Sequence, residues 1–304
     1  MKSARHSGHL EVNNKNVVVS GLFPRVARLH AEYHEYIDNP QQFLSRLKDS
    51  RVRADIFTFL QPVSDRIPKY DYPLRWDKVA ILTIDTYEKW WKQQINDKTR
   101  NMVRRAGKKG VTIQLVEFND ELARGIHAIY SECPLIQGKP SKHYGKDFET
   151  LKKAHATFLD QSVFIGAYYQ GALIGFIKLI LHPHGESASI MQIISMVSHR
   201  DKSPTNALLG KAIELCAERG IHYLQYGIWS RRSLGEFKKH QGFALVEIPR
   251  YFMPLNLRGR IALSLKLNRS FVDFIPGSWL DTFASVRAKW YSFKYRSQTQ
   301  SQGL

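Results

Sequence analysis

The central part of the chain shows hydrophobic patterns that predict alternating strands and helices. The β-branched run Val79–Ile84 is typical of a strand. Asp85 and Glu88 follow it at the spacing of a capping box, so we expect a helix to begin at Thr86. Apolar and aromatic residues then recur at helical spacing until Gly110 ends the pattern. The pattern therefore predicts a strand followed by a long helix.

Further along the chain, the pattern predicts a β-hairpin and a well-marked helix start. Apolar runs between residues 163 and 180 flank the pair Gln170–Gly171, which suits a tight turn with positive φ. After a strand at 189–198, Ser203 is the predicted N-cap and Pro204 the first residue of a helix. The other predicted elements are strands at 111–116, 221–226 and 243–248, and helices at 120–132 and 234–240. This order predicts a mixed α/β fold.

The composition changes along the chain and predicts three segments. Residues 1–78 form a predicted N-terminal extension, because a stretch rich in proline and tyrosine at 67–73 is typical of an extended connector. Residues 79–254 form the predicted main domain, and residues 255–304 form predicted basic helices. The last of these helices has one aromatic and apolar stripe flanked by cations, which suits a helix lying on anionic lipid. The stripe consists of Trp279, Phe283, Val286, Trp290 and Phe293.

The charge balance indicates anionic partners. The 304 residues include 45 Lys and Arg against 27 Asp and Glu, a formal net charge of +18, which suits nucleic acid, anionic lipid or a phosphorylated substrate. A hydrophobic fraction of 43% excludes a disordered or fibrous chain. Cys133 and Cys216 alone make no disulfide scaffold and have no zinc-ligand spacing. Without a signal-peptide core or long apolar segment, we expect a cytoplasmic protein, with peripheral attachment to a membrane still open.

Three stretches of the sequence resemble the Fem-type subfamily of the GNAT acyltransferase superfamily. They are the basic helix Thr99–Val111, the segment Ser203–Leu209 and the segment Phe237–Phe243. The order of elements from residue 79 to residue 248 also resembles the GNAT fold, so the resemblance covers somewhat over half of the chain. It implies an enzyme that moves an activated acyl or aminoacyl group from acyl-CoA or aminoacyl-tRNA to an amine on a small molecule or an envelope precursor. It leaves open whether residues 1–78 are a remnant of a second GNAT-like half.

The sequence departs from the acetyl-CoA enzymes of this superfamily at two points. Their pyrophosphate loop has glycines that let backbone N–H groups approach the phosphates, whereas the matching stretch Arg200–Thr205 has none. Where those enzymes carry a tyrosine that protonates the leaving thiolate, this chain has Lys238. Both departures favour the Fem-type interpretation. The predicted donor-binding residues are Arg200, Lys202, Ser203, Thr205, Asn206 and Lys238.

Acyl transfer to an amine requires one group that takes a proton from the amine and another that protonates the leaving group. The predicted catalytic residues are Glu132, His143 and Tyr144 around the predicted acceptor loop, and Tyr226 at a strand end. The predicted contacts to the acceptor or to anions are Arg100, Arg104, Arg105 and Lys109 on the basic helix, with Gln137, Lys139 and Lys146 in the loop. We predict no metal site and no tightly bound cofactor.

Two other functions remain open on the sequence. An ordinary acyl-CoA N-acetyltransferase with a degenerate phosphate loop would bind CoA compounds at residues 200–206. A non-catalytic module that kept the fold would use its charge to hold RNA or an anionic membrane, with an affinity that falls steeply with salt. The acceptor, the transferred group and the oligomeric state do not follow from the sequence.

Overall fold

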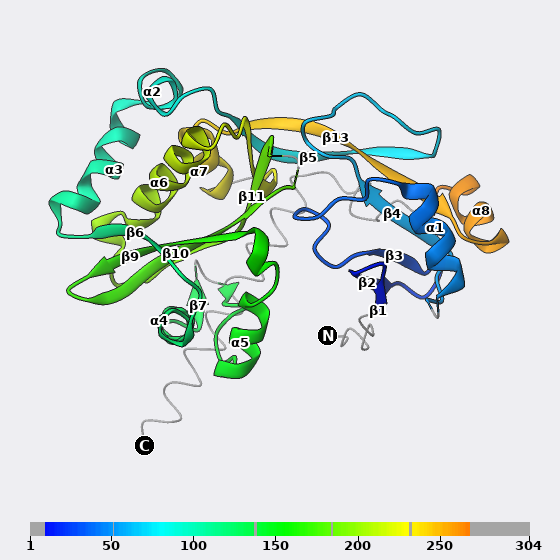
Figure 1. Ribbon diagram of the computed structural model, residues 1–304, viewed down its shortest axis with the longest axis horizontal. Coiled ribbons are helices and arrows are strands. Elements are labelled where there is room, and N and C mark those ends of the chain that lie inside the picture. The colour runs from blue at the N-terminus through cyan, green and yellow to red at the C-terminus, as the bar shows by residue number, and fades with distance from the viewer. Residues whose placement is uncertain (1–9, 51, 137–138, 184, 231–232, 268–304) are drawn as a thin grey trace. The chain divides into compact units, whose positions relative to one another are not determined.

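The computed structural model describes residues 10–50, 52–136, 139–183, 185–230 and 233–267 as a mixed α/β fold (Figure 1). The strands are β1 (Leu10–Val12), β2 (Lys15–Ser20), β3 (Val26–Leu29), β4 (Ile56–Leu60), β5 (Leu74–Thr83), β6 (Thr112–Val116), β7 (Leu135–Ile136), β8 (Lys139–Pro140), β9 (Ser162–Tyr169), β10 (Ala172–Leu181), β11 (Ser187–Ser195), β12 (Tyr223–Ile228) and β13 (Ala244–Pro254). The α-helices are α1 (Pro40–Asp49), α2 (Tyr87–Lys89), α3 (Asp97–Lys108), α4 (Asp120–Ser131), α5 (Phe148–His155), α6 (Pro204–Glu218), α7 (Ser233–His240) and α8 (Leu257–Ser264). A π-helix, η1 (Trp90–Gln94), and two 3-10 helices, η2 (Leu159–Gln161) and η3 (Arg200–Lys202), complete the described elements.

The described strands form one mixed sheet and one short ladder. The eleven-stranded sheet has the order β1-β2-β3-β4-β13-β5-β12-β11-β10-β9-β6, and β7 pairs with β8. β3 pairs with β4 in parallel, as β11 does with β12, whereas β13 is antiparallel to both β4 and β5. Contacts divide the described residues into two compact units. Unit 1 contains residues 10–99, 179–191 and 213–267, and unit 2 contains residues 100–178 and 192–212.

Unit 1 has an aromatic core built on β4 and β13. All five residues of β4 are buried, as expected of a strand covered on both faces. Phe57 of β4 contacts Phe43 of α1, with ring centroids 5.2 Å apart. Phe59 stacks on Tyr251 of β13, also at 5.2 Å. The N-terminal segment thus shares one core with the end of the predicted main domain, and the boundaries at residues 78 and 254 stay predictions.

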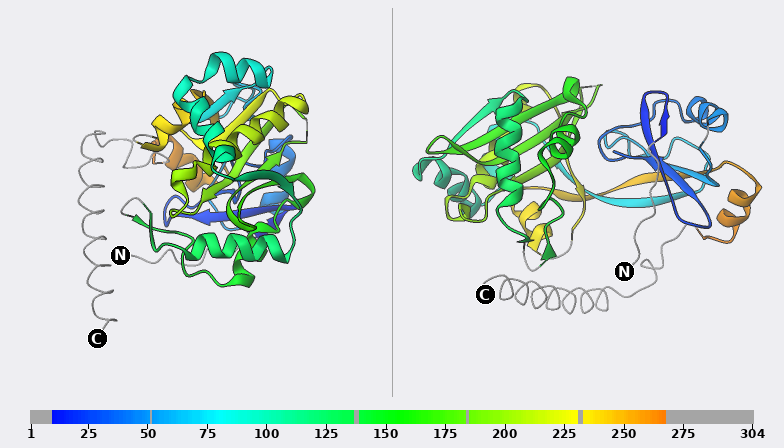
Figure 2. Two further views of the ribbon diagram at one scale, coloured as in Figure 1. Left: turned by 90° about the vertical axis from the view of Figure 1, so that its left-hand side faces the viewer. Right: turned by 90° about the horizontal axis from the view of Figure 1, so that it is seen from below.

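Unit 2 packs its helices closely against β9 and β10. α4 and α5 lie side by side against these strands (Figure 2). The approach of α4 requires a glycine, because a Cβ atom on Gly125 would lie 2.7 Å from Leu173 Cδ2. α6 reaches β10 at Gly175, where an added Cβ atom would lie 3.2 Å from Leu208 Cδ1. These close contacts fix α6, the helix that follows the predicted donor loop, which is the segment 196–203 between β11 and α6.

The predicted hairpin and the α6 helix are confirmed, and the predicted cap at Asp85 is wrong. Gln170 and Gly171 have φ values of 51° and 80°, as a tight turn between β9 and β10 requires. The helix after β5 is capped by Thr86 instead of Asp85, because Thr86 Oγ1 accepts the Lys89 N–H at 3.1 Å. Asp85 pairs with the Lys89 ammonium group at 2.9 Å. The predicted single long helix is divided into α2, η1 and α3.

The predicted C-terminal helices are described only in part. α8 begins after Asn256, whose side chain accepts the Gly259 N–H at 2.9 Å. The aromatic stripe from Trp279 to Phe293 lies outside the described residues. No helix in the described part of the chain is long and apolar enough to cross a membrane.

Candidate active site

The predicted donor loop leaves β11 through η3 and turns abruptly into α6. Ser203, between η3 and α6, has a left-handed backbone with φ of 57°. This differs from the extended backbone of an ordinary N-cap. The Ser203 N–H donates to Arg200 O at 3.0 Å and closes the 3-10 turn. The Ser203 hydroxyl lies 3.5 Å from Met102 Sδ of α3. The donor loop therefore contacts α3 directly.

The two cations of the donor loop differ in how firmly they are held. Lys202 Nζ lies 4.7 Å from the centroid of the Tyr169 ring and 3.2 Å from Asp201 Oδ1. Only 14% of the Lys202 side chain is exposed, so its ammonium group is fixed in place. Arg200 is exposed. A fixed ammonium group and an exposed guanidinium group two residues apart can together bind an oxyanion.

The first turn of α6 offers few backbone donors to a ligand. Pro204 has no N–H, and the Asn206 N–H donates to Ser203 O at 3.1 Å. Thr205 Oγ1 shares a hydrogen bond with Ser195 Oγ at 2.8 Å. The positive end of the helix dipole still faces the loop. An anion at this position would therefore be held mainly by side-chain cations and the helix dipole, without a glycine-lined backbone cradle.

Glu132, directly after α4, holds the residues that follow β11. Its carboxylate accepts the Val197 N–H at 2.5 Å and both the N–H and the hydroxyl of Ser198 at 2.9 and 2.5 Å. Burial alone would raise the pKa of Glu132, but the hydrogen bonds from Ser198 and Val197 outweigh it and lower the pKa. The carboxylate therefore stays ionised near neutral pH, and its contacts suit a role in positioning the donor loop.

His143 lies in the loop between β8 and α5 and packs on a buried tyrosine. Its ring stacks on Tyr130 with the centroids 4.2 Å apart, and its Nδ1 is buried without a hydrogen-bond partner among the described residues. Burial, then the charges of Lys146 and Lys142, lower the pKa of His143. The imidazole is therefore neutral near pH 7 and able to accept a proton. The neighbouring Tyr144 is 48% exposed.

The predicted anion contacts are gathered mainly on α3. Arg104 and Arg105 are exposed, Arg100 is half-buried, and Lys109 is exposed just after the helix ends. Because Met102 on the same helix contacts Ser203, this basic helix adjoins the donor loop. These residues and the donor loop all belong to unit 2. The structure thus brings the predicted donor-loop cations and the basic helix together.

The remaining predicted loop contacts are less informative. Lys146 is exposed, and its carbonyl oxygen lies 3.0 Å from His127 Nε2. Lys139 belongs to β8, and Gln137 lies outside the described residues. Within the described ranges, no group of three or more His, Cys, Asp or Glu side chains is placed to hold a metal ion.

In unit 1, the buried Lys238 lies against the half-buried Tyr226. Lys238 Nζ lies 4.5 Å from the centroid of the Tyr226 ring and donates to the carbonyl oxygens of Tyr226 and Ile228 at 2.6 and 2.8 Å. Burial lowers the pKa of Lys238 to about 8. Burial also raises the pKa of Tyr226, so the phenol keeps its proton near neutral pH. The pair combines a held ammonium group with a protonated phenol.

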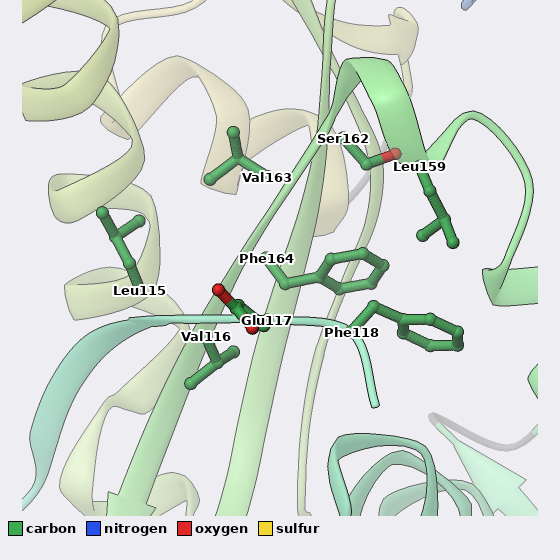
Figure 3. Close-up of a pocket in the computed structure, with 8 residues that line it drawn as sticks. All are labelled: Leu115, Val116, Glu117, Phe118, Leu159, Ser162, Val163 and Phe164. Atoms are coloured by element: carbon green, nitrogen blue, oxygen red, sulfur yellow. The ribbon is translucent and has the colours of Figure 1, made fainter. Parts of the chain in front are cut away.

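A pocket of about 520 Å³ lies along β6 and β9 in unit 2 (Figure 3). Phe118 and Phe164 form its apolar wall, with their rings stacked at 5.2 Å. Glu117 is the charged residue of its lining. None of the predicted site residues lines this pocket.

Sequence reasoning missed three residues that shape the donor loop. Tyr169 carries the ring beneath Lys202, Ser195 bonds Thr205, and Met102 joins α3 to Ser203. Tyr169 and Ser195 each end a strand, and Met102 lies in the apolar stripe of a helix. Nothing in their local sequence distinguishes them from core or strand-end residues. Their role becomes visible only through their contacts with the donor-loop residues in the folded structure.

Residues 123–243 match the family model of the acetyltransferase (GNAT) family. The chain carries a GNAT acyltransferase domain. The matched range runs from α4 through the donor loop to the start of β13, and so includes Glu132, His143, Tyr226 and Lys238. No curated protein sequence matches the chain.

Solved structures extend the likeness beyond the GNAT domain. FemX has a TM-score of 0.56 at 11% identity, over 82% of this chain and 86% of its own. The C-terminal domain assigned to a lysylphosphatidylglycerol synthetase from Agrobacterium fabrum has a TM-score of 0.54 at 12% identity, over 84% and 86%. L-PGS from Bacillus licheniformis has a TM-score of 0.50 at 14% identity, over 83% and 85%. At these identities the likeness concerns the fold, which the Fem-type interpretation predicted.

Proposed function

We propose that the chain transfers an activated aminoacyl group from tRNA to an amine acceptor. The observation that carries this proposal is the contact between the donor loop and the basic helix α3. Met102 contacts Ser203, so the donor loop and the basic helix α3 adjoin each other within unit 2, and their cations can together form one basic surface. A polynucleotide donor carries phosphates along such a surface, whereas a CoA donor needs the local pyrophosphate cradle.

The donor loop is better suited to bind a polyanion through side-chain cations than to bind a single pyrophosphate through backbone N–H groups. Pro204 supplies no N–H, and the Asn206 N–H is used within the turn. The exposed Arg200 remains for phosphate binding, and Lys202 can add to it from its ion pair with Asp201. The names of the similar structures agree with an aminoacyl donor, since a lysylphosphatidylglycerol synthetase makes an aminoacylated lipid. The acceptor of this chain is proposed to be an amine on a small molecule or an envelope precursor.

Two of the four predicted catalytic residues have a proposed task here. His143, neutral near pH 7, takes the proton from the attacking amine. Glu132 positions the donor loop through Val197 and Ser198. Lys238 stays a predicted donor contact, Tyr144 and Tyr226 stay predicted catalytic residues, and attachment of residues 255–304 to anionic lipid stays a prediction.

A thermal-shift titration at fixed salt tests the donor. The probes are acetyl-CoA, uncharged tRNA and an aminoacyl-tRNA analogue with a non-hydrolysable linkage. A ligand that binds only the folded protein raises Tm by mass action. We expect the aminoacyl-tRNA analogue to raise Tm more than uncharged tRNA, and acetyl-CoA to leave Tm unchanged.

Two results would contradict the proposal. Stabilisation by acetyl-CoA that disappears in Arg200→Gln would restore an ordinary acyl-CoA N-acetyltransferase. Equal, salt-sensitive stabilisation by charged and uncharged tRNA would indicate a polyanion-binding module instead.

A further inference from the structure

A second polar cluster lies in unit 1, on residues to which no function has been given above. β11 and β12 pair in parallel only from Ser187 to Ser189 and from Tyr223 to Gln225, although both strands continue beyond the ladder. Ser189 and Gln225 are the last register partners, and neither side chain is exposed. The end of the ladder therefore places two buried polar side chains next to each other.

The segment that follows β3 brings further polar groups to these strands. His34 Nδ1 lies 2.8 Å from Ser189 Oγ, and the Tyr36 hydroxyl donates to Gln225 Oε1 at 2.9 Å. The Tyr36 ring also packs on the imidazole of His182, with centroids 5.0 Å apart. His182 begins the turn between β10 and β11 and is 5% exposed. Five polar side chains thus meet at one place in unit 1.

A buried ionic clamp fixes the segment that carries His34 and Tyr36. Arg250 of β13 is 4% exposed and donates to Glu32 at 2.7 Å, to Asp77 at 2.9 Å and to the Tyr33 hydroxyl at 3.2 Å. Tyr33 in turn donates to Asp77 at 3.0 Å. Charge-assisted bonds of this kind hold backbone and side chains in one geometry. His34 is therefore anchored by the residues directly before it.

Two nitrogen atoms in this anchored cluster have no hydrogen-bond partner among the described residues. They are Gln225 Nε2 and His182 Nε2, both fully buried. Turning the Gln225 amide over would leave its oxygen unmatched instead, so one polar atom is unpaired in either orientation. Buried polar groups in folded proteins are nearly always paired, because leaving one unpaired is destabilising. Two buried nitrogen atoms without partners, held in a rigid cluster, indicate that a ligand group bonds to them.

Gln61 shows what a buried glutamine in the same unit does when its role is structural. It is 1% exposed, and both its side-chain polar atoms are used twice. Its partners are Asp65 O, Ile67 O, the Lys69 N–H and the Tyr251 hydroxyl. Gln225, at equal burial, uses one of its two polar atoms. Within the described part of the chain, Gln241 in the same unit also has an unpaired Oε1, but Gln225 shares a partner, Tyr36, with a second residue that has an unpaired buried atom, His182.

We infer that this cluster binds a neutral amide or hydroxyl group of the acyl acceptor. The group would accept a hydrogen bond from Gln225 Nε2 and share another with His182 Nε2. The inference rests on the proposed function only in naming the ligand as the acceptor. The binding site itself follows from the buried, unpaired nitrogen atoms.

The charges around the cluster favour a neutral ligand. Burial, then His34, lowers the pKa of His182 to about 4, so its ring is uncharged near pH 7. Arg250 is balanced by Glu32 and Asp77. Glu35, on the same segment, pairs with Lys15 at 3.5 Å. A charged ligand group would be buried without a counter-ion, which is strongly unfavourable.

The first test compares two buried histidines in the ligand-free protein. His182→Phe keeps the ring beside Tyr36 and removes the unpaired nitrogen, so we expect Tm to stay unchanged or rise. His155→Phe is the matched control, because His155 is 7% exposed and its Nε2 bonds the Tyr130 hydroxyl at 3.1 Å. We expect this variant to lower Tm by roughly 2 to 6 °C. An equal fall in both variants would show that His182 has a structural partner, and would overturn the inference.

The second test measures binding by NMR of the side-chain amide of Gln225, assigned as the signal missing from Gln225→Met. The probes are N-acetylglycinamide, glycerol and, as the anionic control, sodium acetate, each up to about 100 mM, where small fragments bind. We expect a saturable shift with the amide or with glycerol and none with acetate, and a dissociation constant about tenfold weaker in His182→Phe. Acetate binding alone, or no saturable shift, would overturn the inference.

The same variants distinguish a failure of this inference from a failure of the proposed donor. If the aminoacyl-tRNA analogue still raises the Tm of Gln225→Met while the probes fail to bind the wild-type protein, only the acceptor site is wrong. If the probes bind and no donor raises Tm, the site stands and the proposed donor fails.

Discussion

At the scale of single residues, the contacts of Glu132 favour a positioning role over the proton-transfer role that its sequence position also allows. A carboxyl group in the acceptor loop suits proton transfer, and the sequence places Glu132 among the catalytic residues. In the structure, its oxygen atoms accept three hydrogen bonds from Val197 and Ser198. Those bonds favour the ionised form, and they tie the end of α4 to the donor loop.

Glu132→Gln tests this positioning role through the pH dependence of stability. Near pH 7 we expect the variant to be less stable by about 1 to 3 kcal/mol, because an amide cannot accept all three bonds. The folded pKa of Glu132 lies below its ordinary value of 4.5, so its contribution is complete above about pH 5 and is lost as the pH falls through the folded pKa. Urea unfolding at pH 7 and in acid measures this gap, the difference in unfolding free energy between the wild-type protein and the variant. A gap that does not narrow in acid would contradict the role.

The residue scale also shows what the sequence could predict of the site. Arg200 and Lys202 could be predicted as anion contacts, because Ser203–Pro204 marks the start of a helix and these two cations directly precede it. The lowered pKa of His143 could not be predicted from the sequence, because it depends on burial against Tyr130 and on the nearby charges of Lys146 and Lys142 in the fold. Unpaired atoms such as Gln225 Nε2 leave no trace in a sequence, since pairing is a property of the fold.

At the scale of elements, local signals were predicted well and distant pairings were not. The β9–β10 hairpin follows from its turn residues, and α6 follows from its buried stripe of Leu208, Ala212 and Leu215. The pairing of β4 with β13 joins residues almost two hundred positions apart, and no local pattern specifies such a partner. The π-helix η1 was missed because its aromatic residues also fit α-helical spacing.

Trp90 tests how η1 is held. Its side chain is not exposed, and its Nε1 donates to Gln241 O at 3.0 Å, tying the π-helix to the residue after α7. Trp90→Phe leaves that buried carbonyl without this donor and opens a cavity, so we expect a loss of about 2 to 4 kcal/mol. Trp91→Phe, at a half-buried position, is the control, with a loss of about 1 kcal/mol or less. Chemical denaturation of both variants measures the difference, and equal losses would contradict this account of η1.

At the scale of the whole molecule, the formal net charge of +18 predicts salt-dependent binding of a polyanion. If Arg105 and Lys109 each contact a phosphate, replacing both with glutamine lowers the slope of log K against log salt by about 2. The matched control is Lys48→Gln with Lys153→Gln, which removes two exposed charges from α1 and α5. Filter binding of tRNA over a salt series measures both slopes. Equal slopes for the two double variants would show that the basic helix is not the contact surface.

The central claim is that the donor loop presents an aminoacyl donor for transfer, and donor discharge tests it most directly. The measurement is the rate at which the protein releases a radiolabelled amino acid from aminoacyl-tRNA in the presence of a soluble amine, with thiol release from acetyl-CoA followed in parallel. We predict discharge of aminoacyl-tRNA above the spontaneous rate, lost in Arg200→Gln with Lys202→Gln and reduced about a hundredfold or more in His143→Asn. Thiol release from acetyl-CoA with no discharge of aminoacyl-tRNA would contradict the claim.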